Sequence, residues 1–312
     1  MTDTPLTIAS SELSADVALL GAELVRLDDA VGNPLLWSGD PNVWAGRAPL
    51  LFPIVGTLAD DTFLHRGHSW RLPRHGFARR STFTLIERGT AHVALRLEAS
   101  AETLAVWPFA FRLDVTHAID GATLSTTAEV TNLSDEPMPT AFGFHHGFRR
   151  PLPGAGARGD HRIRFEAPEP GPIHRLAPNG LLDPTPRPTP VVGDTLALDD
   201  ALFADDVVMM LAPASRRLVY GTEHVHLAIA HPDMPHLGLW TKPGAGFLCI
   251  EPWQGHADPV GAPGEITAKP GSLLLAPGES RRFSIAVTLE FRTDEPSVSQ
   301  LRNERSRSMR KA

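Results

Sequence analysis

Residues 109–116, with the sequence FAFRLDVT, carry the pattern that most clearly indicates the architecture of this 312-residue chain. The large apolar residues occupy every second position, and Arg112, Asp114 and Thr116 lie between them. This alternation is typical of a β-strand with one buried face. The pattern recurs in VALRLE at 93–98 and in FSIAVTLEF at 283–291. Asp120-Gly121 supplies turn chemistry that predicts a hairpin after the first segment.

Glycine and proline are spread along the whole chain, as 26 and 29 residues respectively, and leave little room for long helices. We therefore predict an all-β fold, one large antiparallel β-sandwich with few short helices. Positions 151–190 are rich in proline, glycine and charge, with a short strand near 163–165. Because similar strand patterns lie on both sides, we interpret this stretch as a long surface loop near the mouth of a site. We expect a single domain over 1–293 and a disordered or weakly ordered tail over 294–312.

The composition excludes several classes of protein. A net charge of −7 argues against a nucleic-acid binder, which would normally have a basic face. The single cysteine, Cys249, rules out an intrachain disulfide. We find no signal-peptide pattern and no apolar run of membrane-spanning length. We expect a cytoplasmic protein whose partner is a small molecule, not a nucleic acid or a membrane.

Three short polar islands interrupt the strand-like sequence: PRHGFAR at 73–79, GFHHGF at 143–148 and CIEPW at 249–253. Each combines a histidine or glutamate with aromatic residues and with glycine or proline. A small polyol such as a sugar needs aromatic faces for its C–H surfaces and titratable groups for its hydroxyls. We predict that the islands converge in one cleft and transfer protons on a hexose.

The first two islands offer three histidines. His75 lies in a turn between Pro73 and Gly76, and Arg79 adds a fixed cation nearby; the alternative for His75 is an ordinary surface loop. His145 and His146 are adjacent, so in an extended segment they point to opposite faces and only one can enter the cleft. A metal site is the weaker interpretation, because no set of partners at ligand spacing accompanies the pair. We expect no metal and no organic cofactor.

The third island places Glu251 at the end of an apolar run and before Pro252. Partial desolvation there should raise the carboxyl pKa, whereas pairing with a nearby arginine is an equally good interpretation. Trp253 and Trp240 could stack on a sugar or pack in the core. Asp206 precedes an apolar run and either accepts sugar hydroxyls or caps a turn. His117 falls on the apolar phase of its strand and is interpreted as a core histidine.

The three islands in this order resemble the aldose 1-epimerase (mutarotase) family, with the nearest match in its bacterial branch that carries the His-Gly-Phe-Ala-Arg signature. The resemblance extends over nearly the whole chain. It includes the segments GAEL at 21–24, APLLFP at 48–53, WPF at 107–109, NLSDEPMP at 132–139 and LGLWTKP at 237–243. It implies a galactose mutarotase-like supersandwich, which agrees with the all-β prediction.

The resemblance also implies roles for the site residues. Glu251 matches the family's catalytic base, His145 its catalytic acid, and His75 a second histidine that orients the sugar. Asp206 looks like the carboxylate that binds a sugar hydroxyl, and Arg79 looks like a contact to substrate or to an anion. In such a mechanism the ring opens and recloses on the other face, which requires an ionised Glu251 and a protonated His145.

Two positions depart from the family pattern. His146 stands where relatives commonly have proline, and Thr57 where they often have arginine. Arg47 could compensate for the missing cation. Three alternatives to the mutarotase remain: a hexose-6-phosphate 1-epimerase with an arginine clamp drawn from Arg47, Arg74 and Arg79, a carbohydrate-binding protein without activity, and a cupin-like metalloenzyme. The identity of the sugar and the oligomeric state are left open.

Overall fold

The structure is a computed structural model that describes residues 4–262 and 264–291. Within these ranges it is all-β, as predicted, and no helix is longer than four residues. The helical segments are α1 (Ala101–Leu104) and the 3₁₀ turns η1 (Ala59–Asp61), η2 (Ala78–Arg80), η3 (Arg158–Asp160), η4 (Asp200–Phe203) and η5 (Ile266–Ala268). None of these described helices has the length and apolar character needed to cross a membrane. The predicted tail at 294–312 lies outside the described residues.

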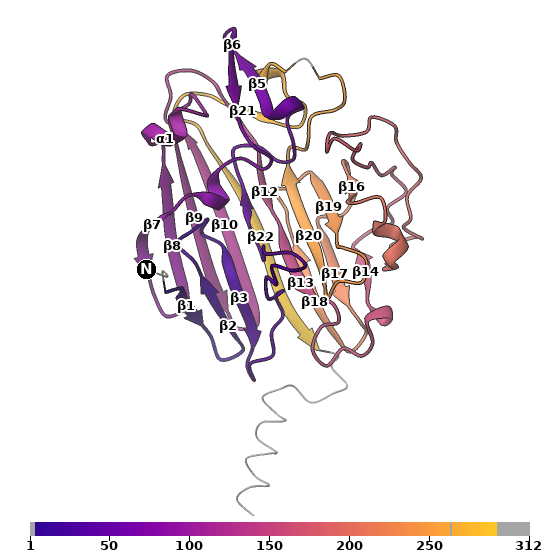
Figure 1. Ribbon diagram of the computed structural model, residues 1–312. Coiled ribbons are helices and arrows are strands. Elements are labelled where there is room, and N and C mark those ends of the chain that lie inside the picture. Colours follow the sequence, from indigo (N-terminus) through magenta and orange to yellow (C-terminus); the bar gives the residue numbers. More distant parts are fainter. Residues whose placement is uncertain (1–3, 263, 292–312) are drawn as a thin grey trace, which may run out of the picture.

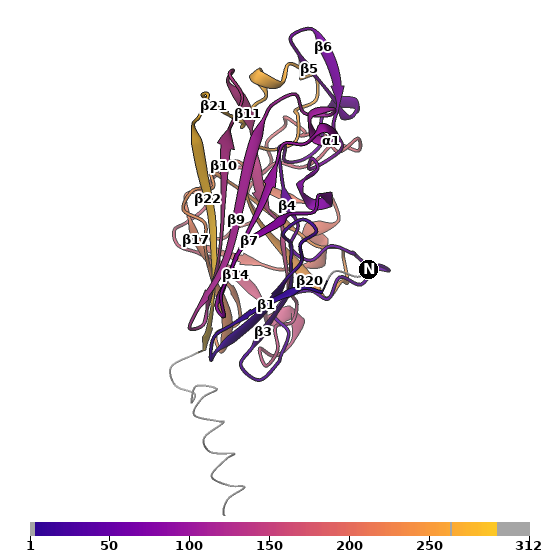
Figure 2. The same ribbon diagram turned by 90° about the vertical axis from the view of Figure 1, so that its left-hand side faces the viewer.

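Two antiparallel sheets form the two layers of the sandwich (Figures 1 and 2). The larger sheet has nine strands, in the order β15 (Thr195–Ala197), β14 (Arg162–Phe165), β17 (Arg217–Gly221), β18 (Val225–Ala230), β22 (Ser280–Phe291), β10 (Thr123–Asn132), β9 (Phe111–Asp120), β8 (His92–Glu98) and β7 (Thr84–Arg88). The second sheet has six strands, in the order β16 (Val208–Met210), β19 (His236–Trp240), β20 (Phe247–Gln254), β12 (Phe142–Phe144) and β4 (Leu50–Leu51), with β13 (His146–Arg149) also paired to β20.

Three smaller sheets complete the fold. Figure 2 shows the first of them in the same layer as β4 and β20, opposite β9, β10 and β22. These sheets are β1 (Leu6–Ala9), β2 (Leu13–Val17) and β3 (Leu24–Asp29); β5 (Thr62–His65) and β6 (His68–Arg71); and β11 (Met138–Thr140) and β21 (Leu273–Leu275). One hydrophobic core cluster takes residues from Leu6 to Leu289, so both ends of the described chain contribute to it.

The alternating segments fold as the sequence predicts. Along β9 every second residue is buried, and its hairpin with β10 pairs Asp120 with Thr123. His117 lies on the buried phase of β9, where its ring nitrogens contact Thr126 Oγ1 at 2.9 Å and the Ala22 carbonyl at 3.0 Å. Because both nitrogens have partners, His117 is the satisfied core histidine that the sequence predicts.

The central strand of the second sheet, β20, is buried along its whole length. Such a strand should read as a continuous apolar run, as it does from Phe247 to Ile250. Its second half instead brings Glu251 and Gln254 into the interior, with 2% and 8% of their surface exposed. A buried carboxylate is costly unless nearby groups compensate for the lost water. This exception marks the position of the candidate site.

Candidate active site

The register of three strands places His145 opposite Glu251. On one side of them Gly143 of β12 pairs with Trp253 of β20, and on the other His146 of β13 pairs with Ile250. His145 lies between β12 and β13, and the same register continued across it places His145 opposite Glu251. The two residues are therefore cross-strand neighbours whose side chains share one face of the sheet. Pro252 lacks an N–H group and so interrupts the ladder at this point. β12 ends at Phe144 and β13 begins at His146, so His145 lies between the two paired segments.

The two side chains are in contact. His145 Nε2 lies 3.2 Å from Glu251 Oε2, and the residues are 9% and 2% exposed. The remaining polar atoms of the pair, His145 Nδ1 and Glu251 Oε1, are buried and have no hydrogen-bond partner in the described part of the chain. An unsatisfied buried polar atom costs about 1–3 kcal/mol, so a ligand that supplied hydroxyl groups would recover much of that cost.

Burial sets the protonation of this pair. Desolvation raises the pKa of the Glu251 carboxyl well above 4.5, and it lowers the pKa of the His145 imidazole to about 3. Both shifts favour the neutral forms, so a carboxylic acid and a neutral imidazole share one proton. The raised pKa of Glu251 agrees with the sequence-based expectation. The expected protonated His145 does not, because the imidazolium would lose its hydration in this interior.

His75 enters the same space from a tight turn. His75 and Gly76 both have left-handed backbones, with φ of 65° and 68°, and a Cβ on Gly76 would collide with the Phe52 carbonyl. The Gly56 N–H and the Arg74 Nε each lie 3.1 Å from one ring nitrogen of His75. Burial holds the pKa of His75 well below 6.5, so one of these nitrogens keeps the single proton of a neutral ring. The ring lies perpendicular to that of His145, with centroids 6.0 Å apart.

Aromatic side chains form the walls of the cavity, which has a volume of about 240 Å³. Trp44 stacks on His145 at a centroid distance of 5.1 Å and meets Trp240 edge-on at 5.6 Å. Trp253 lies across Gly143 and Gly238, where any Cβ would collide with the indole. Trp240 and Trp253, the two tryptophans predicted from the sequence, therefore both line the cavity. Gly143 and Gly238 leave room for the indole ring of Trp253 because they carry no Cβ.

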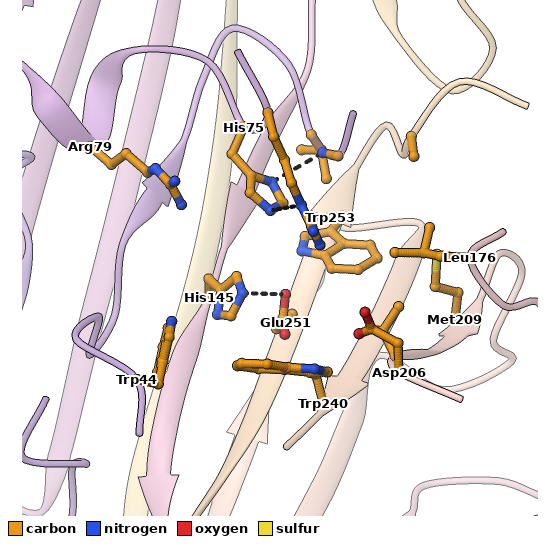
Figure 3. Close-up of a pocket in the computed structure, with 15 residues that line it drawn as sticks. Trp44, His75, Arg79, His145, Leu176, Asp206, Met209, Trp240, Glu251 and Trp253 are labelled. Carbon is orange, nitrogen blue, oxygen red and sulfur yellow. Dashed lines mark hydrogen bonds and ion pairs between the residues drawn. The ribbon is translucent and has the colours of Figure 1, made fainter. Parts of the chain in front are cut away.

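Charged side chains occupy opposite ends of the cavity. Figure 3 shows Arg79 on the side of His145 and Trp44, and Asp206 beyond Glu251 on the side of Leu176. Within the described ranges, the guanidinium of Arg79 makes no hydrogen bond or ion pair. Burial and its neighbours Arg80 and Arg74 lower the pKa of Arg79 to about 10. Leu176 belongs to the loop over 151–190, which thus borders the site as predicted.

One expectation about the residues that line the site is not met. Arg47 does not line the cavity, and its Nε donates a hydrogen bond to the Ser38 carbonyl at 2.9 Å. It therefore cannot compensate for the arginine that relatives often carry where this chain has Thr57. Thr57 itself lies in a groove next to the cavity. In contrast, His146 points away from Glu251 as predicted for one of two adjacent histidines, and its ring packs against Phe144 and Phe148 in the core.

Sequence reasoning missed Trp44, which stacks on the histidine of the central pair. Its signal was a lone aromatic residue in the otherwise polar segment DPNVW at 40–44. Leu176 and Met209 were also missed, because nothing in their local sequence distinguishes them from ordinary core residues.

Three side chains of the site hold potential metal-ligand atoms close to one another. His145, Cys249 and Glu251 each offer one ligand atom, and these atoms lie within 4.8 Å of one another. Cys249 precedes Glu251 by two residues on β20 and therefore shares its face. A thiol binds metal as thiolate, but burial and the nearby Glu251 raise the pKa of Cys249 well above 9.0. The trio is thus a poor match for a metal site.

Comparison with known proteins agrees with the fold and shows the family. The family model for aldose 1-epimerase matches residues 5–288. The chromosomal protein LacX of Lactococcus lactis subsp. lactis is 30% identical over 296 residues, which cover 91% of this chain and 99% of LacX.

Solved structures give the same result. A galactose mutarotase related enzyme from Lactobacillus acidophilus superposes with a TM-score of 0.86 at 28% identity, covering 94% of this chain and 100% of that one. A galactose mutarotase-like protein from Lactobacillus casei gives 0.85 at 28% identity, covering 92% and 100%. With the family model matching nearly the whole chain, this protein belongs to the aldose 1-epimerase family.

Proposed function

We propose that this protein is a mutarotase that interconverts the α and β anomers of a hexose by opening and reclosing the sugar ring. One observation carries the proposal: the Glu251–His145 pair, with 3.2 Å between Oε2 and Nε2, faces a cavity of about 240 Å³ walled by tryptophans. Membership of the aldose 1-epimerase family supports the same reaction class.

The shared proton lets the pair act as acid and base together. Moving it from Glu251 Oε2 to His145 Nε2 produces a carboxylate beside an imidazolium without changing the total charge. Sugar hydroxyls that reach Glu251 Oε1 and His145 Nδ1 would hydrogen-bond to the charged forms, and hydrogen bonding to a charged form favours it. Substrate binding therefore generates the reactive state from the neutral one.

Ring opening then moves two protons and one bond. The Glu251 carboxylate takes the proton from the anomeric hydroxyl, the O–H electron pair becomes the carbonyl π bond, and the C1–O5 bond breaks toward O5. His145 delivers its proton to O5, which leaves a neutral imidazole and a carboxylic acid. Rotation about C1–C2 exposes the other face of the aldehyde, and the reverse transfers close the ring. Positioned acid–base groups of this kind contribute about 10²–10⁴-fold in rate.

The other pocket residues orient the sugar in this proposal. His75 is held by its turn and by the Gly56 amide, so it presents a neutral ring at a fixed position. Asp206, whose backbone carbonyl accepts from Arg175 at 2.8 Å, offers carboxylate oxygens to hydroxyls at the far end of the ring. Trp44, Trp240 and Trp253 supply apolar faces for the C–H surfaces of the sugar.

The test is polarimetry of freshly dissolved α-glucose and α-galactose. Glu251→Gln keeps the shape of the side chain but removes the base, and we expect its rate to fall at least 10²-fold while the far-ultraviolet circular dichroism stays that of the wild type. His145→Asn should lose a similar factor, and the matched change His146→Asn at the adjacent core position should lose less than tenfold. Wild-type protein that binds hexose without accelerating anomer exchange would instead be a carbohydrate-binding protein.

A second candidate, a hexose-6-phosphate 1-epimerase, is favoured by Arg79, whose guanidinium has no partner in the described ranges and lines the cavity. An anionic substituent would pair with it. If that is the function, kcat/KM for glucose 6-phosphate exceeds that for glucose, and Arg79→Gln removes the preference. Arg80→Gln, at the exposed neighbouring arginine, makes the same charge change and should leave it intact. Equal kcat/KM for the two sugars would exclude this candidate.

A further inference from the structure

A buried arginine holds the turn that carries Asp206. The turn runs from Leu202, near the end of η4, to Asp206 at the edge of the cavity. Arg175 is 6% exposed, and its guanidinium donates to both ends of this turn: Nη1 to the Asp206 carbonyl at 2.8 Å and Nη2 to the Leu202 carbonyl at 2.6 Å. Because the guanidinium is planar and rigid, these two hydrogen bonds fix the distance between the ends of the turn.

The backbone of Asp206 needs such support. Its φ is 64°, in the left-handed region, which costs free energy for any residue other than glycine, although aspartate tolerates it better than most. A residue keeps this conformation only where its surroundings enforce it. Here the Asp206 N–H donates to the Phe203 carbonyl at 3.2 Å, and the Asp206 carbonyl accepts from Arg175. The conformation directs the side chain into the cavity, where Figure 3 shows the carboxylate facing Glu251 and Trp240.

The segment that carries Arg175 is itself fixed to the sheet of the site. His174 exchanges two backbone hydrogen bonds with Met209 of β16, with N–O distances of 2.8 and 3.1 Å. The Arg175 carbonyl accepts from the Asp183 N–H at 3.0 Å. Since β16 belongs to the same sheet as β20, Arg175 has a set position relative to Glu251. It can therefore set the position of Asp206 relative to Glu251 as well.

Charge pairing does not explain why an arginine is buried here. Within residues 4–262 and 264–291, Arg175 forms no ion pair, and its Nε is buried without a hydrogen-bond partner. Burial lowers the pKa of Arg175, as expected for a cation whose lost hydration is not fully replaced. An apolar side chain would fill the space without this cost. What an apolar side chain could not supply is the pair of donors to the Leu202 and Asp206 carbonyls.

From this arrangement we propose that Arg175 is a positioning residue for the reaction, which holds the Asp206 carboxylate where it accepts a hydrogen bond from a sugar hydroxyl. The inference rests on the proposed mutarotase function and adds to it a residue that does not touch the sugar. Because Arg175 acts through Asp206, changing Arg175 should matter only while the Asp206 carboxylate is present.

A double-mutant cycle tests this dependence. Exchange NMR with glucose and galactose would give kcat and KM for anomer exchange by the wild type, Arg175→Met, Asp206→Gly and the double variant. Methionine fills much of the space of the arginine stem without donors, and glycine removes the carboxylate while suiting the left-handed backbone. We expect each single variant to raise KM at least tenfold and to change kcat less than threefold, because a contact to the bound sugar is lost. The double variant should have a KM within twofold of that of Asp206→Gly.

The split between KM and kcat separates positioning from a purely structural role. A variant that only destabilises the fold reduces the active fraction, which lowers the apparent kcat and leaves KM unchanged. Arg216→Met is the matched control, because Arg216 Nη1 also donates to two backbone carbonyls, those of Pro213 and Ser215, away from the cavity. It should change KM less than twofold. Should Arg175→Met not fold, Arg175→Lys, which keeps the charge but can reach only one of the two carbonyls, takes its place with an expected rise in KM of at least threefold.

The outcomes separate this inference from the proposed function. If the wild type accelerates neither sugar, the mutarotase proposal fails. If the wild type is active, three results would each overturn the positioning role alone. These are a KM of the Arg175 variant within twofold of the wild type, a loss confined to kcat, and rises in KM that multiply in the double variant.

Discussion

Replacing His146 with leucine should stabilise the protein, and more strongly at pH 5 than at pH 7.5. His146 is 1% exposed, packs between aromatic rings, and has no hydrogen-bond partner for either ring nitrogen within the described residues. Burial lowers its pKa from 6.5 to about 3. Leucine removes two buried unsatisfied atoms, which cost about 1–3 kcal/mol each when they lack partners, and it restores an apolar side chain of similar size.

The dependence on pH follows from proton binding. Between pH 6.5 and about 3 the unfolded state binds a proton at His146 and the folded state does not, so this histidine makes the folded state less stable as the pH falls. At pH 5 the difference of 1.5 pH units from 6.5 corresponds to about 2 kcal/mol, and at pH 7.5 to nearly zero. His146→Leu should therefore gain about 2 kcal/mol more in the free energy of unfolding at pH 5 than at pH 7.5.

The assay is urea unfolding of the wild type and the variant at both pH values, with unchanged m-values as the condition for comparison. His224→Leu, at an exposed histidine, is the control and should leave the pH dependence of stability unchanged. Mutarotation by His146→Leu should stay within tenfold of the wild type, because the side chain faces the core. An equal change in stability at both pH values would show that burial does not keep His146 neutral in the folded state.

Two further predictions concern the acid–base pair. The rate should show no limb centred near pH 4.5 or near pH 6.5, because the raised pKa of Glu251 prevents loss of the shared proton near 4.5 and the lowered pKa of His145 prevents uptake of a second proton near 6.5. An acidic limb centred at 6.5 would argue against this. Treatment with EDTA should leave the rate unchanged, because burial keeps Cys249 a thiol; loss of activity that zinc restores would show a metal enzyme.

The fold was predictable where strands are long enough to display their period. Residues 93–98, 111–116 and 283–291 lie in β8, β9 and β22, with the alternate residues buried as expected. The sheet that carries the site was harder to see. Its strands β4, β12 and β16 have only two or three residues, all buried, and so few residues display no period. They form by pairing with neighbouring strands, β12 with β20, β4 with β12 and β16 with β19, and local sequence does not encode such pairing.

The site was predictable in its residue types but not in its geometry. Glu251, His145 and His75 meet in one cavity, as the three islands predicted. Their separation and charge depend on the register between β20 and the segment around His145, about a hundred residues earlier in the chain. That register places His145 in the interior and so makes its neutral form the favoured one, contrary to the sequence-based expectation. Arg47 failed as a site residue because its side chain turns to the Ser38 carbonyl.

In the proposed mechanism Glu251 and His145 exchange protons with the same bound sugar as one unit, and a double-mutant cycle measures this coupling. Exchange NMR would give the anomerisation rate of the wild type, Glu251→Gln, His145→Asn and the double variant. Groups that act together are strongly non-additive, so the double variant should be no slower than the slower single variant. Rate losses that multiply in the double variant would mean that the two side chains act independently and that no proton is shared between them during the reaction.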